Sequence, residues 1–285
     1  EALLASPLQV NAYDPFTNNT VVWMAAPAEW AGWLTATPDA DSTIGMRLAL
    51  DEPSVRDWLE RSAGRTLSES QMLDTDAATA AVQSAVGRLT TTVDMRLYER
   101  DRTHTVRAGE SITSIAYDYG IPYPYIQAAN PGVDGLNAGQ TLTIPSRDVF
   151  LEYEPVRDKR IVVSISGNWT KVYENDTLLW EWTSSTGVSD SPTWPGVYQI
   201  ISHEINAYAG NWNLYMPYFM GVYKPIPGSG FTNGFHGFPT RGGGQILWEN
   251  SLGTRVTYGC ILLSDANAQR LYEWAENGVV VEILP

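Results

Sequence analysis

The chain has 285 residues, 44% of them hydrophobic, and 32 acidic against 18 basic side chains give it a net charge of −14. This length predicts about two domains of ordinary size. The acidic balance argues against nucleic-acid binding, which normally needs a basic surface, and disfavours binding to an anionic membrane surface. No run reaches the ~20 apolar residues of a membrane span, and no signal peptide or membrane anchor is expected in these residues.

Residues 1–101 are expected to form a small α+β domain. A turn-rich start over residues 1–20 is followed by predicted strands over 20–24, 44–50 and 90–98 and predicted helices over 27–34, 55–61 and 77–86. Asp51 is a candidate N-cap for the second helix, and Thr75 or Asp76 for the third. The segment has no His and no Cys. A spacer or packing domain explains this segment as well as a ligand-binding domain does.

Residues 102–146 carry a clearer pattern. It consists of a strand, two helices and a strand, over residues 103–106, 112–119, 124–130 and 139–145. Ser111 is placed to cap the first helix, and Gly120 to end it as a C′ glycine. The sequence therefore predicts a compact βααβ module.

This unit resembles the LysM module over its whole length. It contains Val-x-x-Gly-Glu-Ser, Ile-x-x-Ile-Ala, Asn-Pro and Gly-Gln-x-Leu-x-Ile-Pro. The resemblance implies binding to glycan that contains N-acetylglucosamine. The implied glycan-binding residues lie in the loop before the first helix: Gly109, Glu110, Ser111 and Ile112.

Residues 147–285 are rich in strand patterns, over 161–165, 171–173, 178–183, 196–202 and 245–248. They hold Cys260, the only cysteine in the chain. A lone cysteine is usually a small buried hydrophobe. Here Thr257-Tyr258-Gly259-Cys260 predicts a glycine-marked bend that enters an apolar strand, where backbone N–H groups can serve an oxyanion. His236 is a candidate base for such a nucleophile.

These residues resemble the L,D-transpeptidase (YkuD) catalytic domain, whose motif is His-Gly, a spacer and Ser/Thr-His-Gly-Cys. The matches are His236-Gly237 and Thr257-Tyr258-Gly259-Cys260, together with Ser184-Ser185-Thr186-Gly187 and Thr193-Trp194-Pro195-Gly196. The resemblance covers roughly residues 157–285. Three departures stand out: Tyr258 replaces the motif histidine, Leu262 replaces a common polar residue, and the spacer is slightly long.

The resemblance implies a mechanism. Cys260, with its pKa lowered by His236, would attack a peptidoglycan stem tetrapeptide, release D-Ala and pass the acyl group to an amine of a second stem, which makes a 3–3 crosslink. Gly259, Tyr258, Thr257 and Gly237 would form the oxyanion site and its surroundings, and Tyr215, Met216 and Tyr218 the substrate cleft.

The same resemblance implies no metal and no other cofactor, carbapenem β-lactams as covalent inhibitors, and an extracytoplasmic, cell-wall-associated protein. Residues 1–101 weakly resemble a peptidoglycan-binding module. Two alternatives stay open: a thiol peptidoglycan hydrolase or carboxypeptidase, in which water resolves the acyl-enzyme, and a non-catalytic wall-binding protein. The expected architecture is thus multidomain: an N-terminal α+β domain (1–101), a βααβ LysM module (102–146) and a β-rich catalytic domain (147–285).

Overall fold

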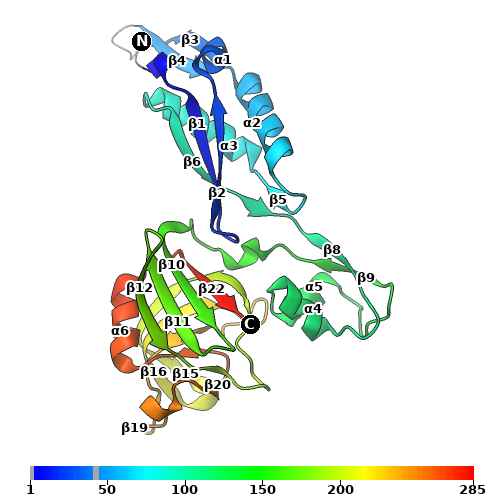
Figure 1. The fold of residues 1–285 in the computed structure, drawn as a ribbon, viewed down its shortest axis with the longest axis vertical. Coiled ribbons are helices and arrows are strands. Elements are labelled where there is room, and N and C mark those ends of the chain that lie inside the picture. The colour runs from blue at the N-terminus through cyan, green and yellow to red at the C-terminus, as the bar shows by residue number, and fades with distance from the viewer. Residues whose placement is uncertain (1–2, 41–44) are drawn as a thin grey trace. The chain divides into compact units, whose positions relative to one another are not determined.

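The computed structural model describes residues 3–40 and 45–285 (Figure 1). The chain divides into two compact units, residues 1–100 and 101–285. Each unit has its own hydrophobic core. The two units are therefore described separately below.

The first unit is an α+β arrangement. Its sheet has the order β2-β1-β6, in which β1 is antiparallel to β2 and parallel to β6. The elements are η1 (Leu3–Ala5), β1 (Leu8–Asp14), β2 (Asn19–Ala25), α1 (Pro27–Trp30), η2 (Ala31–Trp33), β3 (Leu34–Pro38), β4 (Met46–Leu50), α2 (Glu52–Thr66), β5 (Gln71–Met72), α3 (Thr75–Gly87), β6 (Thr92–Arg96) and β7 (Tyr98–Glu99).

Several expectations for this unit need correction. The turn-rich start contains β1, the central strand, whose Leu8, Val10 and Ala12 are fully buried. The helix expected over 27–34 is a single α-turn followed by a 3-10 turn. The third helix is capped by Asp74, whose carboxylate accepts from the N–H of Ala77. The expected strand over 44–50 begins at Met46, and Ile44 lies outside the described residues.

The second unit begins with β8 (Arg102–Thr105), α4 (Ile112–Tyr119), α5 (Tyr123–Ala129) and β9 (Thr141–Ile144). Strands β8 and β9 pair antiparallel, and the two helices lie beside them (Figure 1). Ser111 caps α4 by accepting from the N–H of Ser114, as expected. Gly120 ends the helix with a left-handed φ of 64°.

The rest of this unit is rich in β-strands. Its elements are η3 (Arg147–Phe150), β10 (Val156–Ser164), β11 (Trp169–Glu174), β12 (Thr177–Thr183), β13 (Thr186–Gly187), β14 (Gly196–Gln199), β15 (Ser202–Ala209), η4 (Gly210–Trp212), β16 (Leu214–Tyr223), β17 (Asn233–His236), β18 (Thr240–Arg241), β19 (Gly244–Gln245), η5 (Glu249–Ser251), β20 (Arg255–Thr257), β21 (Ile261–Leu262), α6 (Asp265–Trp274) and β22 (Val279–Leu284). The strand expected over 245–248 is wrong beyond Gln245, because residues 246–248 are irregular and η5 begins at Glu249.

These strands form two main sheets. One has the order β12-β11-β10-β22-β14, and the other the order β19-β18-β16-β17-β21 with β15 paired to β16. In the second sheet β17 and β21 are parallel neighbours. This pairing brings two segments together that are 25 or more residues apart in the chain, and it places the Cys260 turn beside the strand that holds His236.

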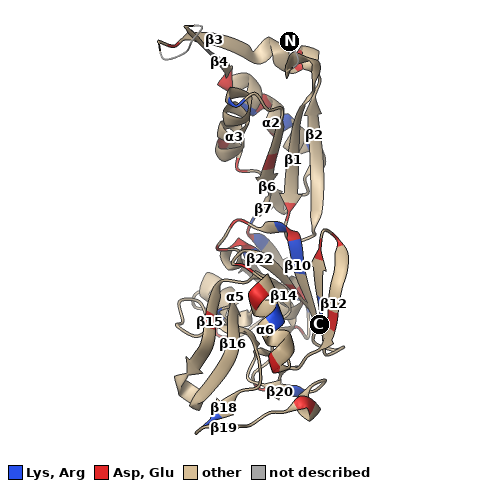
Figure 2. Ribbon diagram, turned by 90° about the vertical axis from the view of Figure 1, so that its left-hand side faces the viewer, with Lys and Arg blue, Asp and Glu red and all other residues tan. Residues whose placement is uncertain are grey.

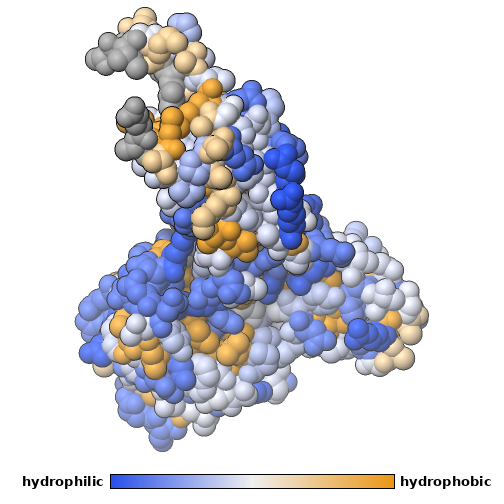
Figure 3. Space-filling model, turned by 45° about the horizontal axis from the view of Figure 1, so that its top comes forward, coloured by the Kyte–Doolittle hydropathy of each residue, from blue (hydrophilic) through white to orange (hydrophobic). Residues whose placement is uncertain are grey.

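Charged side chains of both signs are interspersed over the second unit (Figure 2). Two cations of β10 are paired: Lys159 with Glu276 at 2.6 Å and Arg160 with Glu282 at 2.8 Å. The face shown in Figure 3 carries small hydrophobic patches among hydrophilic side chains.

Candidate active site

The lone cysteine lies at a turn between two short strands. Strand β20 ends at Thr257, residues 258–260 bend, and β21 begins at Ile261. Gly259 has a φ of +105°, a conformation that side chains with a Cβ rarely adopt. A Cβ there would also lie 2.6 Å from the amide nitrogen of Asn233. Glycine is therefore required immediately before Cys260 on both counts.

Two threonine hydroxyls hold the carbonyl groups of this turn. Thr193 donates to the carbonyl of Gly259 at 3.0 Å, and Thr257 donates to the carbonyl of Cys260 at 2.6 Å. In a trans peptide the C=O and the following N–H point in opposite directions. The N–H of Cys260 is therefore directed away from the Thr193 hydroxyl.

His236 is the last residue of β17 and is buried. Its Nδ1 lies 2.6 Å from the carbonyl oxygen of Gly237. A carbonyl can only accept, so this nitrogen carries the proton, and the neutral ring then has an unprotonated Nε2. Among the described residues Nε2 has no hydrogen-bond partner, which leaves its lone pair available to a proton donor.

Burial keeps both groups uncharged. Desolvation lowers the pKa of His236 to about 4, against smaller opposing effects of the Gly237 carbonyl and Asp265. Desolvation also raises the pKa of Cys260 to about 11, although the N–H of Gly234 acts in the opposite direction. The expectation of a thiol with a lowered pKa is therefore wrong. The resting pair is a neutral thiol and a neutral imidazole, not an ion pair.

Asn233 is a contact of the thiol that sequence reasoning missed. Its Oδ1 lies 3.7 Å from Sγ of Cys260, and its amide nitrogen donates to the Tyr223 hydroxyl at 3.3 Å. The β17–β21 register pairs Phe235 with Ile261 and so sets Asn233 level with Gly259. A contact that depends on the pairing of two strands cannot be recognised in a sequence. The one local indication is that Asn233 precedes His236 by three residues in the same strand.

A pocket of about 200 Å³ opens onto these groups. Its lining is mostly apolar and comprises Ala209, Trp212, Leu214, Met216, Phe231, His236, Pro239, Arg241, Ile246, Leu247, Val256, Thr257, Tyr258 and Cys260. Trp212 forms one wall with Tyr258, whose ring stacks on it at 5.6 Å, and with Phe231 at 5.1 Å. Arg241 is the one Lys or Arg in this lining, and its Nε donates to the Trp212 carbonyl.

Of the three residues expected in a cleft, Met216 lines this pocket. Tyr215 points to the other face of β16, where it packs against Tyr208. Tyr218 contacts Tyr272 instead. Strand alternation would return Tyr218 to the face of Met216, but its left-handed φ of 52° breaks the alternation. Tyr215 and Tyr218 therefore lie outside this pocket.

The two departures from the expected motif have different surroundings. Tyr258 is 47% exposed at the rim, and its hydroxyl makes no hydrogen bond with any residue that the structure describes. Leu262 is fully buried in β21, where its backbone pairs with that of Ser185. Leu262 is thus a core residue, whereas Tyr258 extends the aromatic wall of the pocket.

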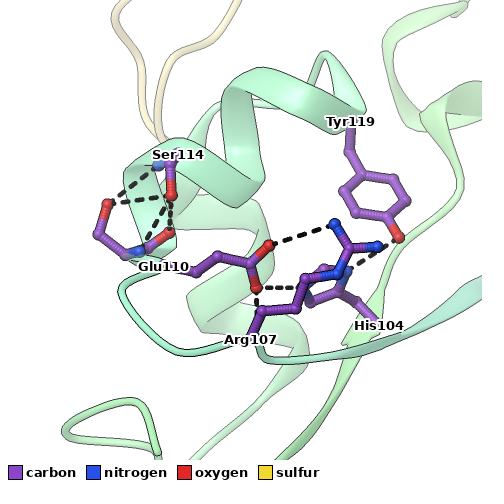
Figure 4. Close-up of polar contacts among 6 residues, drawn as sticks. His104, Arg107, Glu110, Ser114 and Tyr119 are labelled. Carbon is purple, nitrogen blue, oxygen red and sulfur yellow. Dashed lines mark hydrogen bonds and ion pairs between the residues drawn. The ribbon is translucent and has the colours of Figure 1, made fainter. Parts of the chain in front are cut away.

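The loop expected to bind glycan is held by a buried histidine (Figure 4). His104 contacts the Glu110 carboxylate through Nε2 at 2.8 Å and the Tyr119 hydroxyl through Nδ1 at 3.2 Å. Glu110 also accepts from the N–H of Arg107 at 2.7 Å, and these contacts keep its pKa below the usual value. Gly109 turns the loop with a φ of +86°.

The described part of the chain contains no cluster of three or more His, Cys, Asp or Glu side chains that could hold a metal ion. Within the same residues no helix has the length and apolar character needed to cross a membrane.

Comparison with known families matches the two parts of the second unit separately. Residues 158–283 match the L,D-transpeptidase catalytic domain, and residues 104–145 match the LysM domain. A Bacillus licheniformis protein named "Putative L,D-transpeptidase YkuD" is 27% identical over 184 residues, which are 64% of this chain and 98% of that protein.

Two solved structures are also similar. An L,D-transpeptidase from Mycobacterium smegmatis is 18% identical with a TM-score of 0.38, and the match covers 45% of this chain and 59% of that one. An Enterococcus faecium L,D-transpeptidase with its cysteine mutated to serine is 15% identical with a TM-score of 0.44, over 99% of this chain and 97% of that one.

Proposed function

Since the chain contains an L,D-transpeptidase catalytic domain and a LysM domain, we propose that Cys260 is the nucleophile and His236 the base of a peptidoglycan L,D-transpeptidase. The observation that carries this proposal is that both side chains line one pocket, the histidine with an unprotonated Nε2. We further propose the division into residues 1–101, 102–146 and 147–285.

The first step is acylation. Because the thiol is neutral, its proton passes to Nε2 of His236 as sulfur attacks the carbonyl carbon of the third residue of a stem tetrapeptide. The tetrahedral intermediate collapses, the peptide bond to D-Ala breaks, and the imidazolium returns the proton to the leaving amine. The product is a thioester on Cys260.

The oxyanion is held by backbone N–H groups. Thr193 fixes the carbonyl of Gly259, so the N–H of Cys260 is kept in a single orientation opposite to it. We assign this N–H, with that of Gly259, to the oxyanion. Thr257 and Gly237 belong to the supporting turn, and Tyr258 contacts the donor peptide through its ring. Loss of one such donor typically costs about 3–4 kcal/mol.

The second step transfers the acyl group. An amine of a second stem attacks the thioester, His236 accepts the amine proton, and Cys260 leaves as a thiol. The bond formed is a 3–3 crosslink. A stem peptide offers carboxylates, and Arg241 is the cation in the pocket lining that is placed to meet one. No metal or other cofactor takes part.

The LysM module binds the glycan of the same polymer, with Gly109, Glu110, Ser111 and Ile112 in the contact loop. The support is the βααβ unit in which His104 holds the Glu110 side chain of that loop in place. Together these parts suit a secreted, cell-wall-associated enzyme that contributes to cell shape. The N-terminal α+β unit is a second wall-contacting domain, and its tryptophans, which are mostly core residues, do not form its contact surface.

A carbapenem tests the assignment directly. We expect the full chain to gain the mass of one carbapenem, located at Cys260 by peptide mapping, and Cys260→Ala to gain nothing while it keeps its circular dichroism spectrum. The expected residual rate of the variant is zero, because no other thiol exists. An adduct on any other residue would contradict the proposal.

A muropeptide substrate then separates transfer from hydrolysis. Incubation of a disaccharide-tetrapeptide with the enzyme is expected to yield a dimer that has lost one D-Ala. Production of tripeptide alone would instead identify a thiol carboxypeptidase. Absence of any product, with no carbapenem adduct, would leave a non-catalytic wall-binding protein.

A further inference from the structure

The LysM module and the catalytic sheets share one hydrophobic core. The cluster extends from Ile115 and Ile126 of the two LysM helices to Phe235 and Ile261 beside the active site. The left-handed Gly120 that ends α4 also touches the catalytic backbone, because a Cβ on Gly196 would lie 2.4 Å from its carbonyl oxygen. The module is thus packed onto the catalytic sheets without intervening solvent-filled space at this point.

The first line of contact runs through Trp194. Its ring packs against Tyr117 of α4 at 5.3 Å and against Tyr123 of α5 at 5.6 Å. Its backbone N–H donates to the Tyr223 hydroxyl at 2.9 Å. Its neighbour Thr193 holds the carbonyl of Gly259. Tyr117 and Tyr123 of the LysM module therefore pack on Trp194, whose neighbour Thr193 orients the turn that holds Cys260.

A second line reaches the same hydroxyl. Tyr125 of α5 packs edge-on against Phe150 at 4.6 Å, and Phe150 packs against Tyr198 at 5.1 Å. Tyr198 stacks on Tyr223 at 4.4 Å. The Tyr223 hydroxyl then accepts from Asn233, whose Oδ1 accepts from the Cys260 thiol. The two lines converge on one buried tyrosine.

We propose that the LysM module is a structural part of the active site: its aromatic residues hold Trp194 and Tyr223, and these act as positioning residues that fix Asn233 and the Cys260 thiol. The role needs no bound glycan. The inference rests on the proposed function only for its acylation readout.

The physical reason is that the Asn233 side chain has no freedom of its own. Its amide nitrogen donates to the Tyr223 hydroxyl, and the same nitrogen lies 2.6 Å from the position that a Cβ of Gly259 would take. A shift of Tyr223 therefore moves the acceptor of the thiol hydrogen bond. Because Tyr223 is buried in the close-packed core, such a shift is not absorbed by neighbouring space.

Tyr117→Ala is the principal test, since this half-buried side chain belongs to the LysM module and lies outside the pocket. We expect carbapenem acylation to slow about tenfold, within the range for residues that act through others. We also expect alkylation of Cys260 by iodoacetamide to begin at lower pH than in the wild type, because a displaced Asn233 no longer favours the protonated thiol. The alkylation readout is clean because Cys260 is the only thiol.

Tyr119→Ala is the matched control. It removes the same side chain two residues along the same helix, where the ring contacts His104 and not Trp194. We expect it to leave the alkylation profile unchanged and to slow acylation less than Tyr117→Ala does. If Tyr119→Ala slowed acylation as much as Tyr117→Ala, general loosening of the module would explain the effect and the proposal would be overturned.

A double-mutant cycle tests the route. In an Asn233→Ala background, Tyr117→Ala is expected to cause no further shift of the alkylation profile, because the thiol hydrogen bond that it acts through is gone. Additive effects would overturn the proposal. Tyr223→Phe, which keeps the ring and removes only the hydroxyl, covers the case in which Tyr117→Ala fails to fold, and it should shift the alkylation profile in the same direction.

The two hypotheses fail separately. A wild-type chain that forms no carbapenem adduct would contradict the proposed function, while the alkylation profiles would still decide the coupling. A wild-type chain that is acylated normally, with Tyr117→Ala and Tyr223→Phe indistinguishable from it, would contradict the coupling alone.

Discussion

Two buried histidines of this chain differ in what their ring nitrogens contact. His104 in the LysM module is 8% exposed and His236 in the catalytic domain is 4% exposed. Both nitrogens of His104 have partners, the Glu110 carboxylate and the Tyr119 hydroxyl. His236 uses one nitrogen on a backbone carbonyl and keeps the other without a partner among the described residues. Burial does not distinguish the two histidines, whereas the unpartnered nitrogen of His236, which lines a pocket, supports the proposal that it acts as a base.

The largest expected effect comes from exchanging each histidine for glutamine. His236→Gln should slow acylation by about 10²–10⁴-fold, the usual contribution of a general base. His104→Gln should leave acylation unchanged but weaken binding of the full chain to chitin oligomers, because Glu110 loses a partner under the contact loop. Carbapenem mass shift and glycan titration measure the two properties. Equal loss of acylation in both variants would abolish the distinction.

The pH dependence of the free energy of unfolding should show a contribution from His236. Its pKa is about 4 in the folded chain, below the ordinary histidine value of 6.5, so the unfolded chain binds the extra proton first as pH falls. The contribution of His236 to the free energy of unfolding is therefore fully present above about pH 6.5. It falls by roughly 3 kcal/mol as the pH is lowered to about 4.

Urea unfolding of the wild type and of His236→Gln over this range checks the effect. The carboxylates contribute equally to both chains, so the difference between the two slopes isolates the histidine. Cys260→Ala is the control, because it removes a pocket group that does not titrate in this range and should keep the wild-type slope. Parallel curves for all three would show that His236 does not titrate with a lowered pKa.

The smallest effect is expected for Tyr258→Phe. The Tyr258 hydroxyl makes no hydrogen bond with the described residues, and the ring stacks on Trp212. Its removal should change the acylation rate by less than about threefold, whereas the loss of an oxyanion donor costs about 10²–10³-fold. Tyr258→Ala should be slower than Tyr258→Phe, because it also removes the wall. If Tyr258→Phe slowed acylation strongly at every pH, the Tyr258 hydroxyl would belong to the oxyanion site, contrary to this prediction.

Sequence patterns predicted local features well. The caps at Asp51 and Ser111 and the glycine at the Cys260 bend depend on neighbours within a few residues, and the structure confirms these features. The central strand β1 was missed because turn residues at 13–19 dominate its window, while its buried residues gain their stability from sheet partners.

Only those residues of the candidate active site that belong to a sequence motif were predicted. Asn233, Tyr223 and Thr193 contact the nucleophile turn from other strands, and nothing local marks them. The wrong expectation for the thiol has the same origin. A Cys and a His in a sequence suggest an ion pair, but the degree of desolvation that opposes the pair depends on the packing of two sheets.

The core that joins the LysM helices to the catalytic sheets also limits how this protein can be rearranged. A module with its own closed core can be exchanged between chains or shed by proteolysis without cost to its neighbour. Here such an exchange would expose Trp194, Phe150 and their neighbours to water and break the cooperative unit that spans residues 101–285. We expect the LysM helices and the catalytic sheets to be exchanged between proteins together. The boundary of such an exchange should lie near Arg100, where the first compact unit ends.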